Sequence, residues 1–333
     1  MADERRRRRK SQPANTGGKV MLSVFAVMFV LSLGIYLNEK VFRFEWIPTS
    51  AEIISAISGG DTVTAAEGDI TVHFIDVEQG DCELIVAGDT RVLIDCGEAE
   101  YSSRVIRYIS GLGFRRLDYV IATHPHEDHI GGMADILEEF QVGKIIMPEI
   151  PENLLPTGKN FERMLDVIDK KGITAEYSRT GTEIKLDAGA VLQILAPVHS
   201  DYSSLNNFSI ACRLTHGSRS FLFTGDIERA AESDIVNNGE YLTSDVLKVA
   251  HHGSTSSSTP TFIDAVRPQY CVIEVGEGNP YGHPKAEVVE RLESAGAQVL
   301  TTMEYGNIVF ACDGVKLTIH TQNGSFVDER EAA

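Results

Sequence analysis

The run HPHEDHIGG places four potential metal ligands close together: His124, His126, Asp128 and His129. The apolar residues 119–122 before it predict a buried strand, and the residues after it predict a helix. Residues two apart on an extended chain point the same way, so we expect His124 and His126 to bind one metal ion. Asp128 and His129 lie where the chain turns into the helix, and we expect them to face a second ion. The alternative is a polar loop that carries histidines by chance.

A site with two metal ions needs a ligand that both ions share, usually a carboxylate, and further imidazoles. Asp226 follows the apolar run 221–223 and suits the shared position. His251 and His252 follow another strand-like run, 246–250. We expect His252 to be the ligand and His251 to support it or to contact substrate, although ligand chemistry alone does not separate two neighbours. Sites on layered α/β folds are built at such strand ends.

With these motifs the sequence resembles the metallo-β-lactamase superfamily and, within it, the corresponding domain of the ComEC-type competence proteins. The matching segments run in the family's order: 74–81, 93–97, 124–129, 206–209, 224–226, 251–254 and 281–284. The resemblance implies a four-layer αββα sandwich of the α/β class. Glu78 is a departure, because that group usually carries glycine at this position.

The ligand types predict two divalent metal ions, Zn2+ or Mn2+, because a mixed set of imidazoles and carboxylates suits either. The expected ligands are His124, His126, Asp128, His129, Asp226 and His252. Two such ions lower the pKa of a bound water, so that hydroxide is available at neutral pH to attack a phosphorus centre.

Further residues near these motifs are expected to act on the substrate or to orient the ligands. Asp128, His251 and His283 are predicted to take part in catalysis, and His283 would donate to a phosphoryl oxygen or a leaving group. Asp95, which ends a strand, is expected to orient a ligand imidazole rather than to bind metal. In the ComEC-type group the region of Asn206 stands where many members of the superfamily carry another histidine, so Asn206 or water would complete that ligand shell.

For other polar residues the sequence leaves more than one role open. Ser254 begins a hydroxyl-rich loop, 254–261, that either binds phosphate or caps a helix, and capping is favoured. Asp76 and Asp81 flank the turn after the first strand, where a structural and a functional role are equally open. The remaining histidines are predicted to be structural or on a surface turn: His73, His199, His216 and His320.

The amino-terminal part differs from the rest of the chain. An unbroken basic run, 5–10, precedes 18 uncharged residues at 20–37, which as a helix would be about 27 Å long, near the hydrocarbon thickness of a membrane. A cleaved signal peptide, whose apolar part is usually shorter, and a buried core helix are the rival interpretations. The predicted division is basic cytoplasmic residues 1–19, a single membrane anchor at 20–37, a stalk over 38–67, an extracellular hydrolase domain at 68–321 and a frayed polar tail at 322–333.

Charge is distributed unevenly along the chain. Residues 1–66 carry a net charge of +3, and the remainder carries −21. A polyanion is repelled at long range by such a domain, although two divalent ions would add strong local positive charge. The charge balance therefore weighs against DNA as the substrate but not against phosphodiester chemistry.

Five cysteines are scattered through strand-like contexts without any C-x-x-C spacing. This pattern indicates neither a disulfide framework nor a zinc knuckle, so we expect buried, unpaired thiols.

Apolar periodicity predicts an alternating order of elements over the hydrolase domain. Strands are predicted at 70–76, 83–87, 91–95, 118–123, 144–147, 191–195, 209–215, 220–224, 245–250, 270–275, 298–301, 308–311 and 315–320. Helices are predicted at 104–110, 134–140, 161–171 and 287–294, with another opened by the loop 254–261. Strands with interspersed helices indicate a layered α/β architecture.

Three functions are compatible with these features. The leading hypothesis is a membrane-anchored, metal-dependent phosphodiesterase or nuclease. The ComEC-type resemblance implies that its substrate is DNA and that it acts in DNA uptake. The second is hydrolysis of another ester on the cell envelope, such as phosphorylcholine, although the choline-binding repeats usual in that group are absent from the sequence. The third is a non-catalytic binding module, against which the complete ligand set argues.

Overall fold

The computed structural model describes residues 68–322 and 329–331, which are built around two β-sheets. The described residues all belong to one compact unit. The predicted cytoplasmic segment, membrane anchor and stalk lie outside the described residues. Among the helices of the described part, none is both long enough and apolar enough to cross a membrane.

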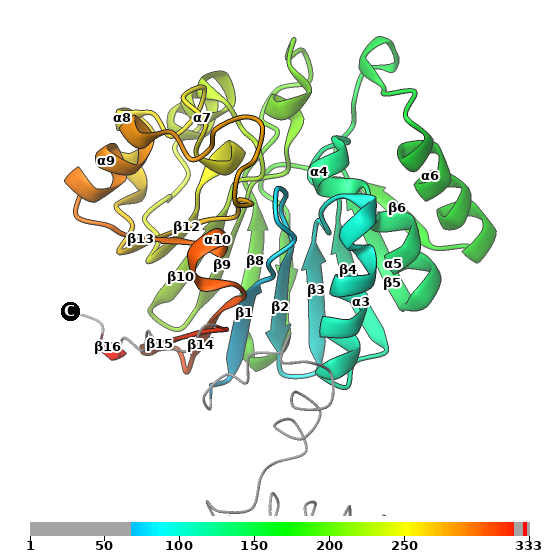
Figure 1. Ribbon diagram of the computed structural model, residues 1–333, viewed down its shortest axis with the longest axis horizontal. Helices are drawn as coiled ribbons and strands as arrows, with labels where there is room; N and C mark the ends of the chain where they lie inside the picture. Colours follow the sequence, from blue (N-terminus) through cyan, green and yellow to red (C-terminus); the bar gives the residue numbers. More distant parts are fainter. Residues whose placement is uncertain (1–67, 323–328, 332–333) are drawn as a thin grey trace, which may run out of the picture. The chain divides into compact units, whose positions relative to one another are not determined.

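The first sheet has the strand order β16-β15-β14-β1-β2-β3-β4-β5-β6 (Figure 1). Val72 of β1 lies opposite Ile85 of β2 and Phe310 of β14, and all three side chains bury the same face. The strands from β3 to β6 are parallel, so their carboxyl ends meet at one edge. The bounds are β1 Ile70–Phe74, β2 Glu83–Ala87, β3 Thr90–Ile94, β4 Arg116–Ile121, β5 Gln141–Met147, β6 Thr174–Tyr177, β14 Ile308–Cys312, β15 Lys316–Thr321 and β16 Glu329–Glu331.

The second sheet has the order β13-β12-β11-β10-β9-β8-β7. Its strands from β10 to β13 are parallel, and β7 to β10 pair antiparallel. The bounds are β7 Glu183–Lys185, β8 Val191–Ile194, β9 Cys212–His216, β10 Arg219–Phe223, β11 Val246–Lys248, β12 Tyr270–Ile273 and β13 Gln298–Thr301.

Apolar side chains from the facing sheets form a central core. The rings of Phe74, on the first sheet, and Phe223, on the second, have centroids 6.2 Å apart. Phe310 and Phe221 make an edge-to-face pair across the same interface, with centroids 5.9 Å apart. Aromatic pairs of this kind bury large apolar areas, so the two sheets are held face to face.

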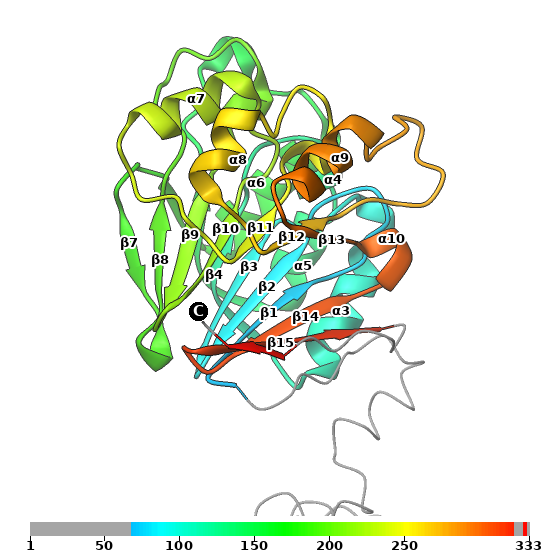
Figure 2. The ribbon, with the colours of Figure 1, turned by 90° about the vertical axis from the view of Figure 1, so that its left-hand side faces the viewer.

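Helices cover the outer face of each sheet (Figures 1 and 2). On α6, for example, the residues Met164, Val167 and Ile168 recur at helical spacing and bury one side of the helix. The first sheet is covered by α3 Ser102–Gly111, α5 Met133–Glu139 and α6 Lys159–Lys171, and the second by α7 Arg229–Asn237, α8 Pro260–Val266 and α9 Ala286–Ser294. Two single-turn helices complete the described part, α4 Glu127–Ile130 and α10 Thr302–Tyr305. The expected layered α/β architecture, with two sheets between helices, is confirmed.

The predicted strands and helices of the hydrolase domain are present, with ends shifted by up to three residues. Six of the described strands and α-helices were not foreseen: β6, β7, β16, α4, α7 and α10. All four residues of β6 are exposed at the sheet edge, so no alternation of apolar and polar residues marks this strand. β16 pairs with β15 inside the segment that was expected to fray.

Candidate metal centre

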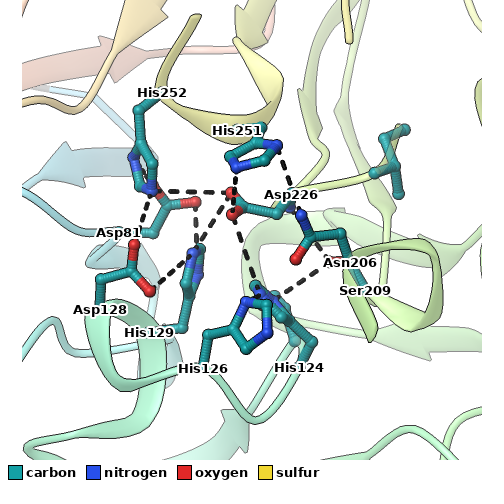
Figure 3. A network of polar contacts seen from close by, with 12 residues as sticks. Asp81, His124, His126, Asp128, His129, Asn206, Ser209, Asp226, His251 and His252 are labelled. Carbon is teal, nitrogen blue, oxygen red and sulfur yellow. Dashed lines mark hydrogen bonds and ion pairs between the residues drawn. The ribbon is translucent and has the colours of Figure 1, made fainter. Parts of the chain in front are cut away.

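Segments that follow strands of both sheets converge on one group of imidazoles and carboxylates (Figure 3). His124 and His126 follow β4, Asp128 and His129 lie on α4, Asp226 follows β10, and His252 follows β11. One cluster contains Asp128, His129, Asp226 and His252, and the other contains His124, His126 and Asp226, with ligand atoms within 4.8 Å of one another in each. The structure thus brings the six predicted ligands together, and Asp226 belongs to both clusters.

The backbone after β11 brings the two adjacent histidines to different oxygens of Asp226. His251 and His252 both have left-handed backbone angles, with φ of 52° and 50°, and Gly253 follows with φ of 81°. Nε2 of His252 lies 3.2 Å from Oδ2 of Asp128 and 3.7 Å from Oδ1 of Asp226. Nε2 of His251 lies 3.8 Å from Oδ2 of Asp226, while its Nδ1 lies 3.0 Å from Oγ of Ser256. Left-handed angles in non-glycine residues are costly and are found preferentially at functional sites.

Hydrogen bonds fix the tautomers of His129 and His252. Nδ1 of His129 lies 2.7 Å from Oδ2 of Asp95, and Nδ1 of His252 lies 2.9 Å from the backbone carbonyl of Glu274. Carboxylates and carbonyls only accept, so both Nδ1 atoms donate and each neutral ring presents an Nε2 lone pair. Nε2 of His129 lies 3.3 Å from Oδ1 of Asp226, and Nε2 of His252 lies 3.2 Å from Oδ2 of Asp128. Both Nε2 atoms therefore face carboxylate oxygens, and as neutral rings the two imidazoles would offer their lone pairs to a cation bound there.

The second cluster has a similar arrangement. Thr123 donates its hydroxyl to Asp95, so this hydroxyl accepts from Nδ1 of His124, 3.2 Å away. Nε2 of His124 then faces Nδ1 of His126 at 3.0 Å and Oδ2 of Asp226 at 3.9 Å. Ser209 supports both groups, because its hydroxyl lies 3.2 Å from Nδ1 of His124 and accepts from the backbone N–H of Asp226.

These residues fit divalent cations. Nε2 of His129 and Oδ1 of Asp226 are buried, and neither has a hydrogen-bond partner among the described residues. Burial alone would lower the pKa of His252, but the carboxylates of Asp226 and Asp81 outweigh burial and raise it to about 10. The site therefore stabilises positive charge, and its imidazole nitrogens and carboxylate oxygens are the ligands that Zn2+ and Mn2+ use.

Two buried aspartates orient the ligand imidazoles from behind. Oδ1 of Asp95 accepts from the backbone N–H of Thr123 at 2.8 Å, and Oδ2 accepts from His129. Asp81 contacts the same cluster, with Oδ1 3.2 Å from Nδ1 of His252 and Oδ2 3.7 Å from Nδ1 of His129. For Asp81 the functional reading is therefore the better supported, whereas Asp76 accepts the backbone N–H of Glu78 within its own loop.

A buried lysine compensates this negative charge. Nζ of Lys248 lies 2.5 Å from Oδ2 of Asp81, and the carboxyl groups of Glu83 and Glu274 belong to the same buried cluster as Asp81. Burial, followed by the charge of Asp81, raises the pKa of Glu274 to about 8. Burial, followed by the charge of Glu274, likewise raises the pKa of Glu83 well above its usual value. The cluster thus carries fewer negative charges at neutral pH than its composition indicates.

A polar cavity of about 360 Å³ opens at the clusters. His283 lies on its wall, with its ring centroid 5.8 Å from that of His251 and 6.5 Å from that of His252. Asn206 also lines it and lies 3.4 Å from Nδ1 of His251. The cavity is lined by Gln79, His126, Glu127, Asp128, Asn206, Asp226, His251, His252, Tyr281 and His283.

Several predicted residues lie outside this cavity. The hydroxyl of Ser254 contacts that of Ser256 at 3.1 Å and does not line the cavity. Thr259 of the same loop caps α8 by accepting from the backbone N–H of Phe262, so the capping interpretation of the loop is confirmed. His199 is a half-exposed surface residue near Asp234, and His73 is buried against Tyr108. The five cysteines are buried and unpaired, as predicted: Cys82, Cys96, Cys212, Cys271 and Cys312.

The departure at Glu78 is explained by its backbone conformation. Glu78 has φ of 58°, a left-handed value that favours glycine. Its carboxylate reaches Arg104 at 3.7 Å, where both side chains are partly exposed. The turn that usually carries glycine is therefore kept here at the cost of backbone strain.

Lys248, Glu274 and Gln79 were not predicted as site residues, although each contributes to this region. A lysine within the otherwise apolar strand 246–250 was a signal for a buried ion pair, because lysine is rarely buried without a partner. Glu274 likewise ends an apolar strand. Gln79 carried no comparable signal, because an amide in a turn is ordinary.

Comparisons with known proteins agree with this site. The sequence pattern described as the Metallo-beta-lactamase superfamily matches residues 75–273. The chain is 30% identical over 264 residues to "ComE operon protein 3" of Bacillus subtilis, covering 74% of this chain and 33% of that protein. It is 29% identical over 247 residues to "Competence protein ComA" of Neisseria gonorrhoeae, covering 73% of this chain and 32% of that protein. The chain thus spans about a third of the length of these curated relatives.

Among solved structures, CmlA, a diiron beta-hydroxylase from Streptomyces venezuelae, superposes with a TM-score of 0.50 at 14% identity. The match covers 74% of this chain and 55% of that one, and it shows a shared fold alone. The family match extends from the end of β1 to the end of β12 and includes the ligands of both clusters. The chain belongs to the metallo-beta-lactamase superfamily.

Proposed function

We propose that this protein is a metal-dependent phosphodiesterase that cleaves its substrate in the cavity beside Asp226. The observation that carries the proposal is the sharing of Asp226 between two ligand clusters at an open, polar cavity. Two divalent cations held by these ligands would supply the charge stabilisation and the activated water that phosphodiester cleavage needs.

The residues of the chain then divide the remaining tasks. Asp95 and Asp81 hold the imidazoles of His129 and His252 in the tautomers that leave Nε2 free. Burial, and then the neighbouring His252 and His251, lower the pKa of His283 to about 4, so its ring is neutral at pH 7. Nδ1 of His283 is buried without a hydrogen-bond partner among the described residues. As a neutral ring it would donate an N–H to a phosphoryl oxygen.

The proposal extends to DNA as the phosphodiester and to the cell membrane as the location. Similarity to a protein named for competence supports DNA. The uncharged segment 20–37, preceded by basic residues, supports a single anchor with the amino terminus in the cytoplasm and the hydrolase domain outside. Protease added to intact cells should digest the hydrolase domain but leave a tag at the amino terminus protected, whereas a protected hydrolase domain would contradict this topology.

Turnover by the purified full-length chain in detergent tests the reaction. The assay compares bis(p-nitrophenyl) phosphate, single-stranded DNA and p-nitrophenyl phosphorylcholine, each with Mn2+ or Zn2+. We expect cleavage of the first two and its loss in Asp226→Ala. Asp234→Ala is the matched control, because Asp234 faces His199 and Tyr202 on the surface. Cleavage of the phosphorylcholine ester alone would favour the envelope esterase, and retained turnover in Asp226→Ala would contradict the shared ligand.

A further inference from the structure

Gln79 presents an unpartnered amide to the cavity of the metal clusters. Gln79 is buried, with 8% of the residue exposed, and it lines the same cavity as Asp226. Neither Oε1 nor Nε2 has a hydrogen-bond partner among the described residues. A buried amide that makes no hydrogen bond costs free energy, so such a group in a native site calls for a ligand that satisfies it.

The backbone holds Gln79 rigidly beside the metal-ligating segment. Asp81, two residues after Gln79, donates its backbone N–H to the carbonyl of Asp128 at 3.1 Å. Gly80 packs so closely that an added Cβ would lie 2.4 Å from the same carbonyl. On the other side, an added Cβ at Gly276 would lie 2.8 Å from the backbone nitrogen of Gln79. The loop is therefore wedged between two segments, and the amide is positioned before any substrate arrives.

The chemistry of the cavity favours an anionic oxygen as the partner of Nε2. The cavity lining already contains three carboxylates, from Glu127, Asp128 and Asp226, but no lysine or arginine. An amide supplies N–H donors without a charge, so it binds a phosphoryl oxygen without forming an ion pair with these carboxylates. A glutamate of the same shape would instead add negative charge at this position.

We propose that Nε2 of Gln79 donates a hydrogen bond to a non-bridging oxygen of the phosphate group that is bound at the metal clusters. Gln79 is thus a substrate-contacting residue, and its assignment rests on the proposed phosphodiesterase function. Because it contacts the phosphate and not the metal ions, its loss should weaken phosphate binding while metal content stays the same.

Calorimetric titration of the metal-loaded full-length chain with inorganic phosphate tests this role, alongside turnover of bis(p-nitrophenyl) phosphate. Gln79→Met keeps the length of the side chain but removes its donors, and Gln79→Glu keeps the shape but adds charge. We expect both variants to retain the metal content of the native chain and to bind phosphate at least about tenfold more weakly, as for one lost hydrogen bond to a charged group. The loss should be larger for Gln79→Glu, and kcat/KM should fall in parallel.

Gln269→Met is the matched control. Oε1 of Gln269 is also buried and unpartnered, but this residue precedes β12, at the opposite end of the parallel strands from the clusters. Unchanged phosphate affinity in both Gln79 variants would overturn the assignment, and so would a loss of affinity explained by lost metal. A native chain that binds phosphate but cleaves no phosphodiester would refute the proposed function while leaving the role of Gln79 measurable by titration.

Discussion

Lys248 and Asp81 form an ion pair that is closed to solvent, with Nζ 2.5 Å from Oδ2 and side chains 0% and 1% exposed. The other oxygen of Asp81 faces the imidazole of His252, so the lysine lies directly behind a metal-site histidine. Two charges held in the protein interior are costly to place there, and each depends on the other. The pair therefore makes the metal centre sensitive to a residue that touches no substrate.

Replacing Lys248 by methionine should destabilise the protein by about 3–5 kcal/mol, because Oδ2 of Asp81 loses its buried ammonium partner. The free energy of unfolding measured by circular dichroism during urea titration checks this. The control is Lys144→Met, since Lys144 pairs with Glu176 at 2.8 Å on the surface. That change should cost no more than about 1 kcal/mol. Equal costs for the two variants would contradict the importance of burial.

Asp95→Asn should weaken metal binding about 10- to 100-fold. An asparagine that keeps the hydrogen bond from the backbone N–H of Thr123 turns its NH2 group toward His129 and the hydroxyl of Thr123. Nδ1 of His129 must then accept, and the proton moves to Nε2, where it blocks the metal. Competition for Zn2+ against a chromophoric chelator measures the affinity. Asp118→Asn is the control, because Asp118 binds Arg91 and Arg116 away from the centre. Native affinity in Asp95→Asn would contradict an orienting role.

The stability contributed by His73 should depend on pH. Burial lowers the pKa of His73 from 6.5 to about 3, so between these values the unfolded chain binds a proton that the folded chain does not. Stability is then fully present above pH 6.5 and is lost as the pH falls toward 3, by at most about 1.4 kcal/mol per pH unit. Urea titrations of the native chain and of His73→Gln should show a stability difference that shrinks with acidification. A difference independent of pH would contradict the buried neutral imidazole.

Glu78→Gly should stabilise the protein by about 1 kcal/mol. The left-handed backbone at Glu78 costs a non-glycine residue about 1–2 kcal/mol, and the partly exposed contact with Arg104 returns less than about 1 kcal/mol. Thermal unfolding should show a higher midpoint for this variant. Glu78→Gln should leave the midpoint unchanged, because glutamine keeps the left-handed φ at this position. Stabilisation by glutamine would instead indicate charge repulsion.

Much of this structure could be predicted from local sequence. The runs 70–74, 219–223 and 308–312 are apolar enough to require burial, and they supply both sides of the central core. The exposed edge strand β6 could not be predicted in this way, because pairing with β5, rather than an apolar pattern of its own, makes it regular. The short helix α7 buries only Ala231, Glu232 and Ile235, a mixed set that gives little apolar periodicity.

The candidate metal centre could likewise be predicted only in part from the sequence. Residue types and spacing pointed to the six residues that form the two candidate ligand clusters, because few side chains bind metal and the motif between His124 and His129 is compact. Sequence did not reveal that Asp81 and Lys248, 167 residues apart, form one buried pair, nor that Gln79 faces the cavity.

The sequence alone determined the strands that form the core and which side chains stand at their ends, since both follow from apolar periodicity and ligand chemistry. Tertiary structure decided which atoms meet. His252 rather than His251 joins the cluster of Asp128 and His129, although both imidazoles face Asp226, because consecutive left-handed residues turn their rings apart. Only packing against the rest of the domain holds that backbone in place.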